Sequence, residues 1–216
     1  MPLPYILAAV TVYGAKKIYD HITEDDVSSY THTQTSSWNK QTIVIGPKGS
    51  GKTRLAHLLA SQENLLGAVH QPTIEKTTVG SYISDYPGDE HCVNTDWVDA
   101  IKKTTYCLYV FDLKNYDDNI IYENHEYKKL VLWHIDLIDD WIKQKGGNSC
   151  NPFATSYCKL IVIGTHADSL EKEDDPKRIL NGIKIELQKR NKNISMRAYD
   201  LLKIKSDKLI NEIDKD

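Results

Sequence analysis

The sequence predicts an α/β fold in three layers, with a mostly parallel central sheet covered by helices on both faces. One reason is that apolar strand-like runs alternate with helical patterns, an order that implies right-handed crossovers between parallel strands. Another is that two of the runs, Tyr106–Phe111 and Leu160–Ile163, are continuously apolar, as expected of strands buried on both faces. A third is the glycine-rich stretch that joins the first strand to the first helix. In such folds the ends of the strands line the ligand crevice.

Each expected strand is a short apolar run between polar or turn residues. In chain order the expected strands are Thr42–Ile45, Val79–Ser84, Tyr106–Leu113, Lys159–Gly164 and Ile194–Leu201. The expected helices carry apolar residues at helical spacing, such as Leu55, Leu58 and Leu59 in the first of them. In chain order these helices are Lys52–Gln62, Asp96–Lys103, Asn119–Lys145, Pro176–Lys189 and Asp207–Ile213.

The longest expected helix, Asn119–Lys145, has an apolar face that we expect to pack on the sheet. The residues of this face are Leu130, Trp133, Leu137 and Trp141. The glycine pair Gly146-Gly147 ends the helix, because glycine favours helix termini. No internal repeat is visible.

Composition excludes several functional classes. The chain has 216 residues, 40% of them hydrophobic and 26% charged, with a net charge of −3, which is typical of a globular domain without a basic surface for nucleic acid. No pair of cysteines forms a C-x-x-C motif, and no histidines have the spacing of a structural metal site. The cysteines are Cys92, Cys107, Cys150 and Cys158. A reducing, cytoplasmic setting without disulfides is expected.

The first 20 residues form an apolar segment that we treat apart from the domain. Leu3–Ala15 is too short to span a bilayer, which takes about 20 residues, and no positive charge precedes it as in a secretory signal. It either attaches the chain to the cytoplasmic face of a membrane, with Lys16-Lys17 at the headgroups, or packs on protein as a short helix. Residues 21–37 are rich in Ser, Thr, Asp and Glu and read as a polar linker, so the folded domain spans residues 38–216.

A phosphate-binding loop follows the first expected strand. The residues that fit G-x-x-x-x-G-K-[ST] are Gly46, Pro47, Lys48, Gly49, Ser50, Gly51, Lys52 and Thr53. Glycines let backbone N–H groups turn toward a phosphate, and the start of the next helix adds its positive dipole end. We expect Lys52 to reach the β- and γ-phosphates and the Thr53 hydroxyl to ligate Mg²⁺. The chain is therefore expected to bind a nucleotide.

Two further motifs narrow the nucleotide. Asp85-Tyr86-Pro87-Gly88 follows an apolar strand, where Asp85 can hold Mg²⁺ through its water shell and Gly88 can offer its N–H to a γ-phosphate. Thr165-His166-Ala167-Asp168 follows another strand, and the Asp168 carboxylate could accept the N1–H and N2–H₂ groups of guanine. Adenine lacks this donor pair, so Asp168 would disfavour ATP. The alternative for Asp168 is an ordinary loop or helix-capping acid.

These motifs, in this order and on these strands, resemble the phosphate, magnesium and guanine motifs of Ras-like small GTPases, P-loop proteins with a TRAFAC-type G domain. The resemblance covers roughly residues 40–216. It implies the three-layer P-loop NTPase fold, bound GTP or GDP with Mg²⁺, slow GTP hydrolysis, and two loops that switch with the nucleotide. It also implies an effector or regulator protein as partner. Thr165 and His166 join Asp168 in the nucleotide site, as does Arg54, which we expect to point into its own helix.

The sequence departs from the family pattern at the hydrolytic position. Asp89 follows Gly88, where many relatives place the glutamine that orients the attacking water. Asp89, Glu90 or His91 could position that water instead. We therefore assign catalysis to Lys52, Asp89 and His91, and expect very slow hydrolysis.

Three other departures concern the switch and the base. The candidates for the switch threonine that closes on Mg²⁺ are Thr73, Thr77 and Thr78, of which we prefer Thr73. The segment from Thr73 to Asp85 is short for the family's two-stranded hairpin. His166 replaces the family lysine over the base, and 200–203 stands where a Ser-Ala motif is expected.

Three functions remain open at this point. The first is a GTP-hydrolysing switch. The second is a GTP-binding scaffold with weak catalysis, which Asp89 favours. The third is a P-loop kinase of a small molecule, which would need a cluster of arginines to clamp the transferred phosphate. The arginines of this chain, which form no cluster in the sequence, are Arg54, Arg178, Arg190 and Arg197.

Overall fold

The computed structural model of the chain describes residues 38–62, 75–88, 96–147, 158–171 and 175–215. The chain divides into two compact units, residues 1–35 and 36–216, and the described residues all belong to the second unit. The apolar segment and the polar linker predicted before residue 38 lie outside the described part. Within that part, no helix combines the length and the apolar character needed to cross a membrane.

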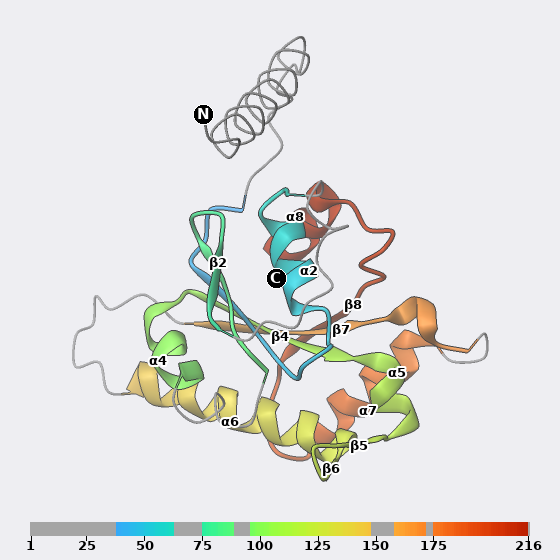
Figure 1. Cartoon of the computed structure of the whole chain (residues 1–216). Helices are drawn as coiled ribbons and strands as arrows, with labels where there is room; N and C mark the ends of the chain where they lie inside the picture. The colour runs from blue at the N-terminus through green and yellow to red at the C-terminus, as the bar shows by residue number, and fades with distance from the viewer. Residues whose placement is uncertain (1–37, 63–74, 89–95, 148–157, 172–174, 216) are drawn as a thin grey trace, which may run out of the picture. The chain divides into compact units, whose positions relative to one another are not determined.

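A mixed sheet forms the centre of the described domain (Figure 1). Its strand order is β2-β3-β1-β4-β7-β8, and every neighbouring pair is parallel except β2 and β3. The strands are β1 Thr42–Ile45, β2 Thr77–Val79, β3 Ile83–Asp85, β4 Tyr106–Asp112, β7 Lys159–Thr165 and β8 Ser195–Ala198. The predicted mostly parallel α/β sheet is confirmed.

Helices cover both faces of this sheet, as Figure 1 shows. One face carries α2 (Lys52–Leu59) and α8 (Ser206–Asp214). The other face carries α4 Asp96–Lys103, α5 Leu113–Asp118, α6 Tyr127–Gly147 and α7 Pro176–Gln188. A small antiparallel hairpin, β5 (Ile121–Tyr122) with β6 (His125–Glu126), stands between α5 and α6. The short helix η2 (Ala167–Ser169) follows β7.

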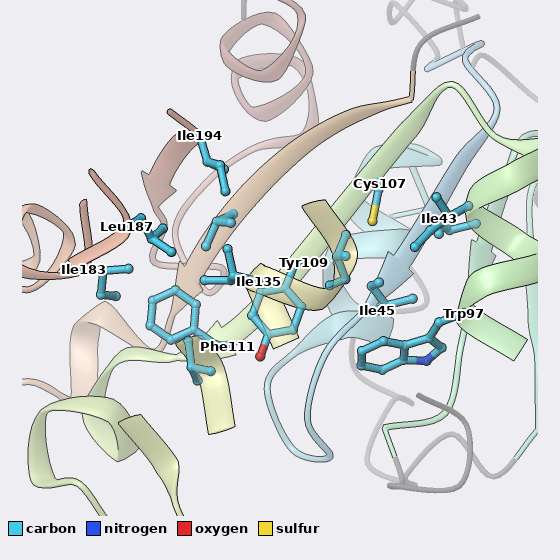
Figure 2. Packing of buried hydrophobic residues seen from close by; sticks show 14 of the residues in the cluster. Ile43, Ile45, Trp97, Cys107, Tyr109, Phe111, Ile135, Ile183, Leu187 and Ile194 are labelled. Atoms are coloured by element: carbon cyan, nitrogen blue, oxygen red, sulfur yellow. The ribbon is translucent and has the colours of Figure 1, made fainter. Parts of the chain in front are cut away.

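The alternation of side chains along the strands produces two hydrophobic cores. In β1, Ile43 and Ile45 face the core beneath α4 and α6, whereas Val44 faces the core beneath α2 and α8. Figure 2 shows residues of the first core, among them Tyr109 of β4 and Ile135 of α6. Because β1 is buried on both faces, the loop that follows it starts from a fixed point.

The segment before Asp85 folds differently from the prediction. The expected single strand Val79–Ser84 is instead an antiparallel hairpin, in which β2 pairs with β3. Gly80 adopts φ 65° at the turn, a conformation that glycine reaches without strain. The segment from Thr73 to Asp85 had been expected to be short for a two-stranded hairpin. It nevertheless holds one, because each of the two strands has only 3 residues.

The expected helix Asn119–Lys145 is wrong at its beginning. Asp112 caps α5, accepting the N–H of Asn115 at 3.0 Å, and Asn119 ends this helix in the left-handed conformation with φ 51°. Glu123 and Asn124 then take positive φ in the turn of the β5–β6 hairpin, which no continuous helix allows. Helix α6 consequently begins at Tyr127. The other element ends differ from prediction by a few residues, as helix and strand termini commonly do.

The predicted packing face of α6 is correct in part. Leu130 is buried, and Leu137 and Trp141 pack against the core, but Trp133 is 47% exposed. The most deeply buried positions of α6 are Tyr127, Val131, His134, Ile135 and Ile138. The buried stripe is thus rotated by about one residue from the predicted one, since the residues that directly follow Leu130, Trp133 and Leu137 are buried more deeply than these three.

Candidate functional site

The glycine-rich loop passes directly beside strand β4. A methyl group on Gly46 would lie 1.9 Å from the carbonyl oxygen of Val110, and Gly46 has φ 143°, so this position admits only glycine. Gly49 and Gly51 have φ 80° and 83°, left-handed values that bend the loop back toward α2. The Ser50 N–H donates to the Pro47 carbonyl at 3.3 Å, which closes the turn. The loop therefore forms a compact curve that ends at the N-terminus of α2.

Lys52 is buried at the centre of this curve. Its Nζ donates to the carbonyl oxygen of Pro47 at 2.9 Å, so the ammonium group folds back over the loop. Lys52 is also the first residue of α2, whose N-terminal N–H groups carry partial positive charge. The loop thus combines an ammonium group with helix-terminal amides, the features of a phosphate-binding site.

Thr53 lies next to the acid predicted to act with it. The Thr53 hydroxyl donates to the Asp85 carboxylate, with 2.6 Å between the oxygens, and Asp85 is completely buried at the end of β3. Hydroxyl and carboxylate oxygens suit Mg²⁺, which is usually held by one or two protein oxygens together with phosphates and waters. The described residues contain no group of three or more His, Cys, Asp or Glu that could hold a metal alone. The pair fits the predicted ion, provided that phosphates complete its shell.

Gly88 lies against the phosphate loop. A methyl group on Gly88 would come within 2.5 Å of both the Gly46 carbonyl oxygen and the Lys48 amide nitrogen. The segment before it is fixed by the Tyr86 N–H, which donates to Val44 at 3.1 Å, and by the Trp97 indole, which donates to Pro87 at 3.3 Å. The approach of the two backbones therefore requires glycine at this position.

Thr165 joins the predicted base site to the phosphate loop. Its buried hydroxyl lies 2.7 Å from the Ser50 carbonyl oxygen and 3.0 Å from that of Phe111. A hydroxyl has one hydrogen, so the two carbonyls share this donor. The contact brings the loop after β7 to the side of the phosphate loop.

His166 and Asp168 extend outward from this junction. His166 has φ 54°, and its Nδ1 lies 3.1 Å from the Thr165 hydroxyl and 3.2 Å from the Asp112 carboxylate. Asp168 lies in η2 with an exposed side chain. Its carboxylate is thus open to a ligand beside the loop.

The loop at 200–203 closes the same side of the site. The Asp200 carboxylate accepts the Leu202 N–H at 2.9 Å and pairs with Lys203 at 2.9 Å, and this pairing, with Asp168 nearby, raises the pKa of Lys203. Arg54 donates from Nε to the Leu201 carbonyl at 2.9 Å. The expectation that Arg54 points into its own helix is therefore wrong, and its role in nucleotide binding stays a prediction.

Several predicted site residues lie outside the described part of the chain. These are Thr73, Asp89, Glu90 and His91. The other switch candidates, Thr77 and Thr78, are exposed on β2, where Thr77 pairs with Asp85 across the hairpin. The structure thus brings together the phosphate-loop, Asp85–Gly88 and Thr165–Asp168 segments, and it does not test the hydrolytic residues.

Two tyrosines that sequence reasoning missed also belong to this region. The Tyr122 hydroxyl accepts the Lys48 N–H of the phosphate loop at 3.1 Å, and the Tyr127 hydroxyl accepts the Asp112 N–H at 3.1 Å. Both come from the segment that had been predicted as one long helix. Of the two residues in the turn, Asn124 is a usual turn residue and Glu123 is not, so the sequence signal for a hairpin was weak.

Comparison with solved structures identifies the fold. The chain is similar to the signal recognition particle receptor SRb–GDP–Mg from Chaetomium thermophilum, with TM-score 0.55 and 11% identity over 82% of this chain and 99% of that chain. It is also similar to the mammalian SRP receptor, with TM-score 0.52 and 14% identity over 81% and 98% of the respective chains. A bacterial selenocysteine-specific elongation factor, EF-Sec, gives TM-score 0.52 and 15% identity over 82% of this chain, which spans only 28% of that protein.

At these identities the likeness concerns the fold alone, and the fold is that of G-domain GTPases, as the motif resemblance predicted. No protein-family model matches the sequence, and no curated protein matches it. The described domain is accordingly a divergent G-domain fold.

Proposed function

We propose that this chain binds GTP and GDP together with Mg²⁺, hydrolyses GTP slowly, and acts as a nucleotide-dependent switch. The observation that carries the proposal is the contact between the Thr165 hydroxyl and the Ser50 carbonyl at 2.7 Å. It puts the residues suited to a guanine base beside the residues suited to phosphates. A single nucleotide can then engage both sets.

The phosphates would lie on the loop from Gly46 to Thr53. Lys52 neutralises charge at the β- and γ-phosphates, and the loop amides donate to their oxygens. Thr53 and Asp85 would hold the magnesium ion, which would supply positive charge against the negative charge that develops on the phosphates. The buried position of Asp85 keeps its carboxylate fixed for this role.

The base would lie between His166 and the loop at 200–203. The Asp168 carboxylate accepts the two adjacent N–H donors of guanine, whereas adenine would leave it unpaired. The His166 ring covers one face of the base by stacking. These contacts favour guanine over adenine nucleotides.

The hydrolytic and switching parts of the proposal rest on sequence alone. Asp89 or His91 positions the attacking water, and residues 71–80 and 85–92 change arrangement when the γ-phosphate is lost. An effector or regulator protein would bind one of the two loop arrangements in preference to the other. We also propose that residues 1–20 attach the chain to the cytoplasmic face of a membrane, with 21–37 as the tether. The SRb–GDP–Mg structure has the same fold, and this likeness supports the nucleotide part of the proposal.

The test measures nucleotide identity and turnover together. The full chain, purified without added nucleotide, is expected to retain GDP or GTP and to release phosphate from GTP far faster than from ATP. Lys52→Ala should abolish both activities, and Lys189→Ala, which alters an exposed lysine on the distant end of α7, should preserve them. Retained ADP, or turnover of ATP by the wild type, would overturn the assignment of Asp168.

A second candidate, a GTP-binding scaffold without turnover, is favoured by the identity of Asp89. A carboxylate is a poor substitute for the amide that orients water, because it only accepts hydrogen bonds. Tight GTP binding with no phosphate release, even after a cell extract supplies an activating protein, would select this candidate.

A further inference from the structure

We propose that a cavity at the opposite edge of the sheet from the phosphate loop binds a small anion with an apolar tail. The cavity has a volume of about 750 Å³ and lies between α6, α7 and the beginnings of the parallel strands β7 and β8. The other end of β7 is Thr165, which contacts the phosphate loop. The cavity is therefore separate from the site proposed for the nucleotide, and the two ligands can be bound at the same time.

One face of α7 supplies the cations of this cavity. The residues of this face follow one another at i, i+3, i+4 and i+7 spacing, and they are Lys177, Leu180, Asn181 and Lys184. Another face of the same helix packs into the first core, where Figure 2 shows Ile183. The pattern of α7 thus places two lysines over the cavity, in addition to the face that the fold requires.

The charges around the cavity favour a negatively charged ligand. Lys177 and Lys184 are exposed, and no acid among the described residues pairs with either of them. Lys159 and Arg197 also line the cavity. The acid of the lining, Asp139, already pairs with two other lysines, at 2.7 and 3.1 Å. The positive charge of the two α7 lysines is therefore left for a ligand to neutralise.

The floor of the cavity is apolar. Two of its apolar side chains are buried, and four others remain partly exposed although they pack against the first core. The buried pair is Cys158 and Ile194, and the partly exposed side chains are Ile142, Leu160, Leu180 and Met196. An apolar tail that covers the exposed part removes it from water, which is favourable. The lining thus suits a molecule with an anionic head and an apolar tail.

The size of the cavity points to a small molecule. Ligand pockets of about 300–1,000 Å³ typically combine apolar walls with a few polar groups that orient the ligand. Asn181, Asn193 and Ser195 supply such groups here. Lys177 and Lys184 begin about 10 Å apart along the helix, a distance that their flexible side chains can bridge around one head group. The structure therefore assigns the cavity to a carboxylate or a phosphate carried on an alkyl or aryl tail.

The test uses isothermal titration calorimetry of the full chain with probes that separate head from tail. Octanoate and octyl phosphate share one tail, and the one that binds more tightly identifies the head group. Octanol, which lacks charge, should bind more weakly than either anion. Inorganic phosphate, which lacks a tail, should bind roughly a hundredfold more weakly than octyl phosphate, because each buried methylene adds to binding.

A double variant tests the location. Lys177→Gln with Lys184→Gln should weaken binding of the octyl anions roughly fivefold, because exposed ion pairs each contribute little, and should leave octanol binding unchanged. Lys102→Gln with Lys189→Gln removes the same charge from exposed lysines outside the cavity and should change no affinity. All four lysines are exposed, so both double variants should melt at the temperature of the wild type.

Four results would overturn the inference. They are no binding of either octyl anion, octanol binding as tight as that of the anions, anion binding that the Lys177/Lys184 variant leaves unchanged, and displacement of the anion by GDP. Unchanged binding in that variant would place the anion elsewhere, such as on the apolar residues 1–20, and displacement would place it at the phosphate loop. The proposed GTP binding is measured separately, so either conclusion can fail while the other stands.

Discussion

Replacing Thr165 by valine should measure how strongly the base side and the phosphate side of the site depend on each other. Valine keeps the shape of threonine and removes the hydroxyl that lies 2.7 Å from the Ser50 carbonyl and 3.0 Å from the Phe111 carbonyl. The group is buried, so no water replaces it without rearrangement. Leaving a buried acceptor without its donor costs about 1–3 kcal/mol. We expect the free energy of unfolding to fall by that amount.

The assay is urea and thermal unfolding of the wild type, Thr165→Val and Thr165→Ser, monitored by circular dichroism. In a domain of this size the expected loss corresponds to a decrease in melting temperature of roughly 2–12 °C. Thr165→Ser retains the hydroxyl and loses one methyl group, so it should cost only about 1 kcal/mol. GDP affinity should fall for the valine variant and recover in the serine variant.

Two results would refute the reasoning. A valine variant as stable as the wild type would mean that the Thr165 hydroxyl does not stabilise the junction. A serine variant as unstable as the valine variant would mean that the methyl group, and not the hydrogen bond, is responsible.

Three further predictions concern stability elsewhere in the domain. Lys192→Met should lower the free energy of unfolding by about 2 kcal/mol in urea titrations, because three aspartates of α6 surround the buried ammonium group. The loss is limited because one of these aspartates, Asp140, is 58% exposed. As the control, Lys189→Met removes an exposed ammonium group and should cost almost nothing. Burial, with a smaller contribution from His125, lowers the pKa of His134 from 6.5 to about 3. Below pH 6.5 the unfolded chain therefore binds a proton at His134 that the folded chain does not bind, and the free energy of unfolding should fall by about 1.4 kcal/mol per pH unit. In urea titrations across pH 4–7, His134→Asn should lack this part of the pH dependence. Gly182→Ala should raise stability by about 0.5–1 kcal/mol in thermal unfolding, since its methyl would meet nothing within 4 Å and helix α7 favours alanine; a decrease would contradict this.

The sequence was most informative where a residue type is imposed by the local backbone. Gly46 and Gly88 have no room for a side chain, and Thr53 meets Asp85 because the loop after β1 leads into α2 beside the end of β3, the parallel neighbour of β1. These constraints act within a few residues or through strand order, so spacing and apolar runs were enough to predict them. Thr165 was predictable for the same reason, as it ends β7 beside the loop.

The sequence was least informative where tertiary contacts override the local pattern. Residues of the β5–β6 hairpin match a helical pattern, but tertiary contacts, among them those of Tyr122 with Lys48 and of Tyr127 with Asp112, stabilise the hairpin instead. Neither contact has a local signature, because each joins the hairpin to a distant segment. The apolar spacing along α6 was likewise misleading at one position, because it assigned Trp133 to the core although this residue is half exposed.

The central position of β1 has a consequence for how the domain folds. Its neighbours come from far along the chain: Thr42 pairs with Ile83 on one side and Tyr106 on the other, and Tyr106 pairs in turn with Lys159. Such pairing closes long loops before any contact rewards it, so folding is expected to be slow for a domain of this length. During synthesis, β1 can pair with β4 only after β4 has left the ribosome. The curve of the loop at Gly46, which lies against Val110, is therefore among the later features to form. A nascent chain that stops before β4 would leave one edge of the mostly apolar strand β1 unpaired and prone to aggregation, with β3 as its only neighbour in the described sheet.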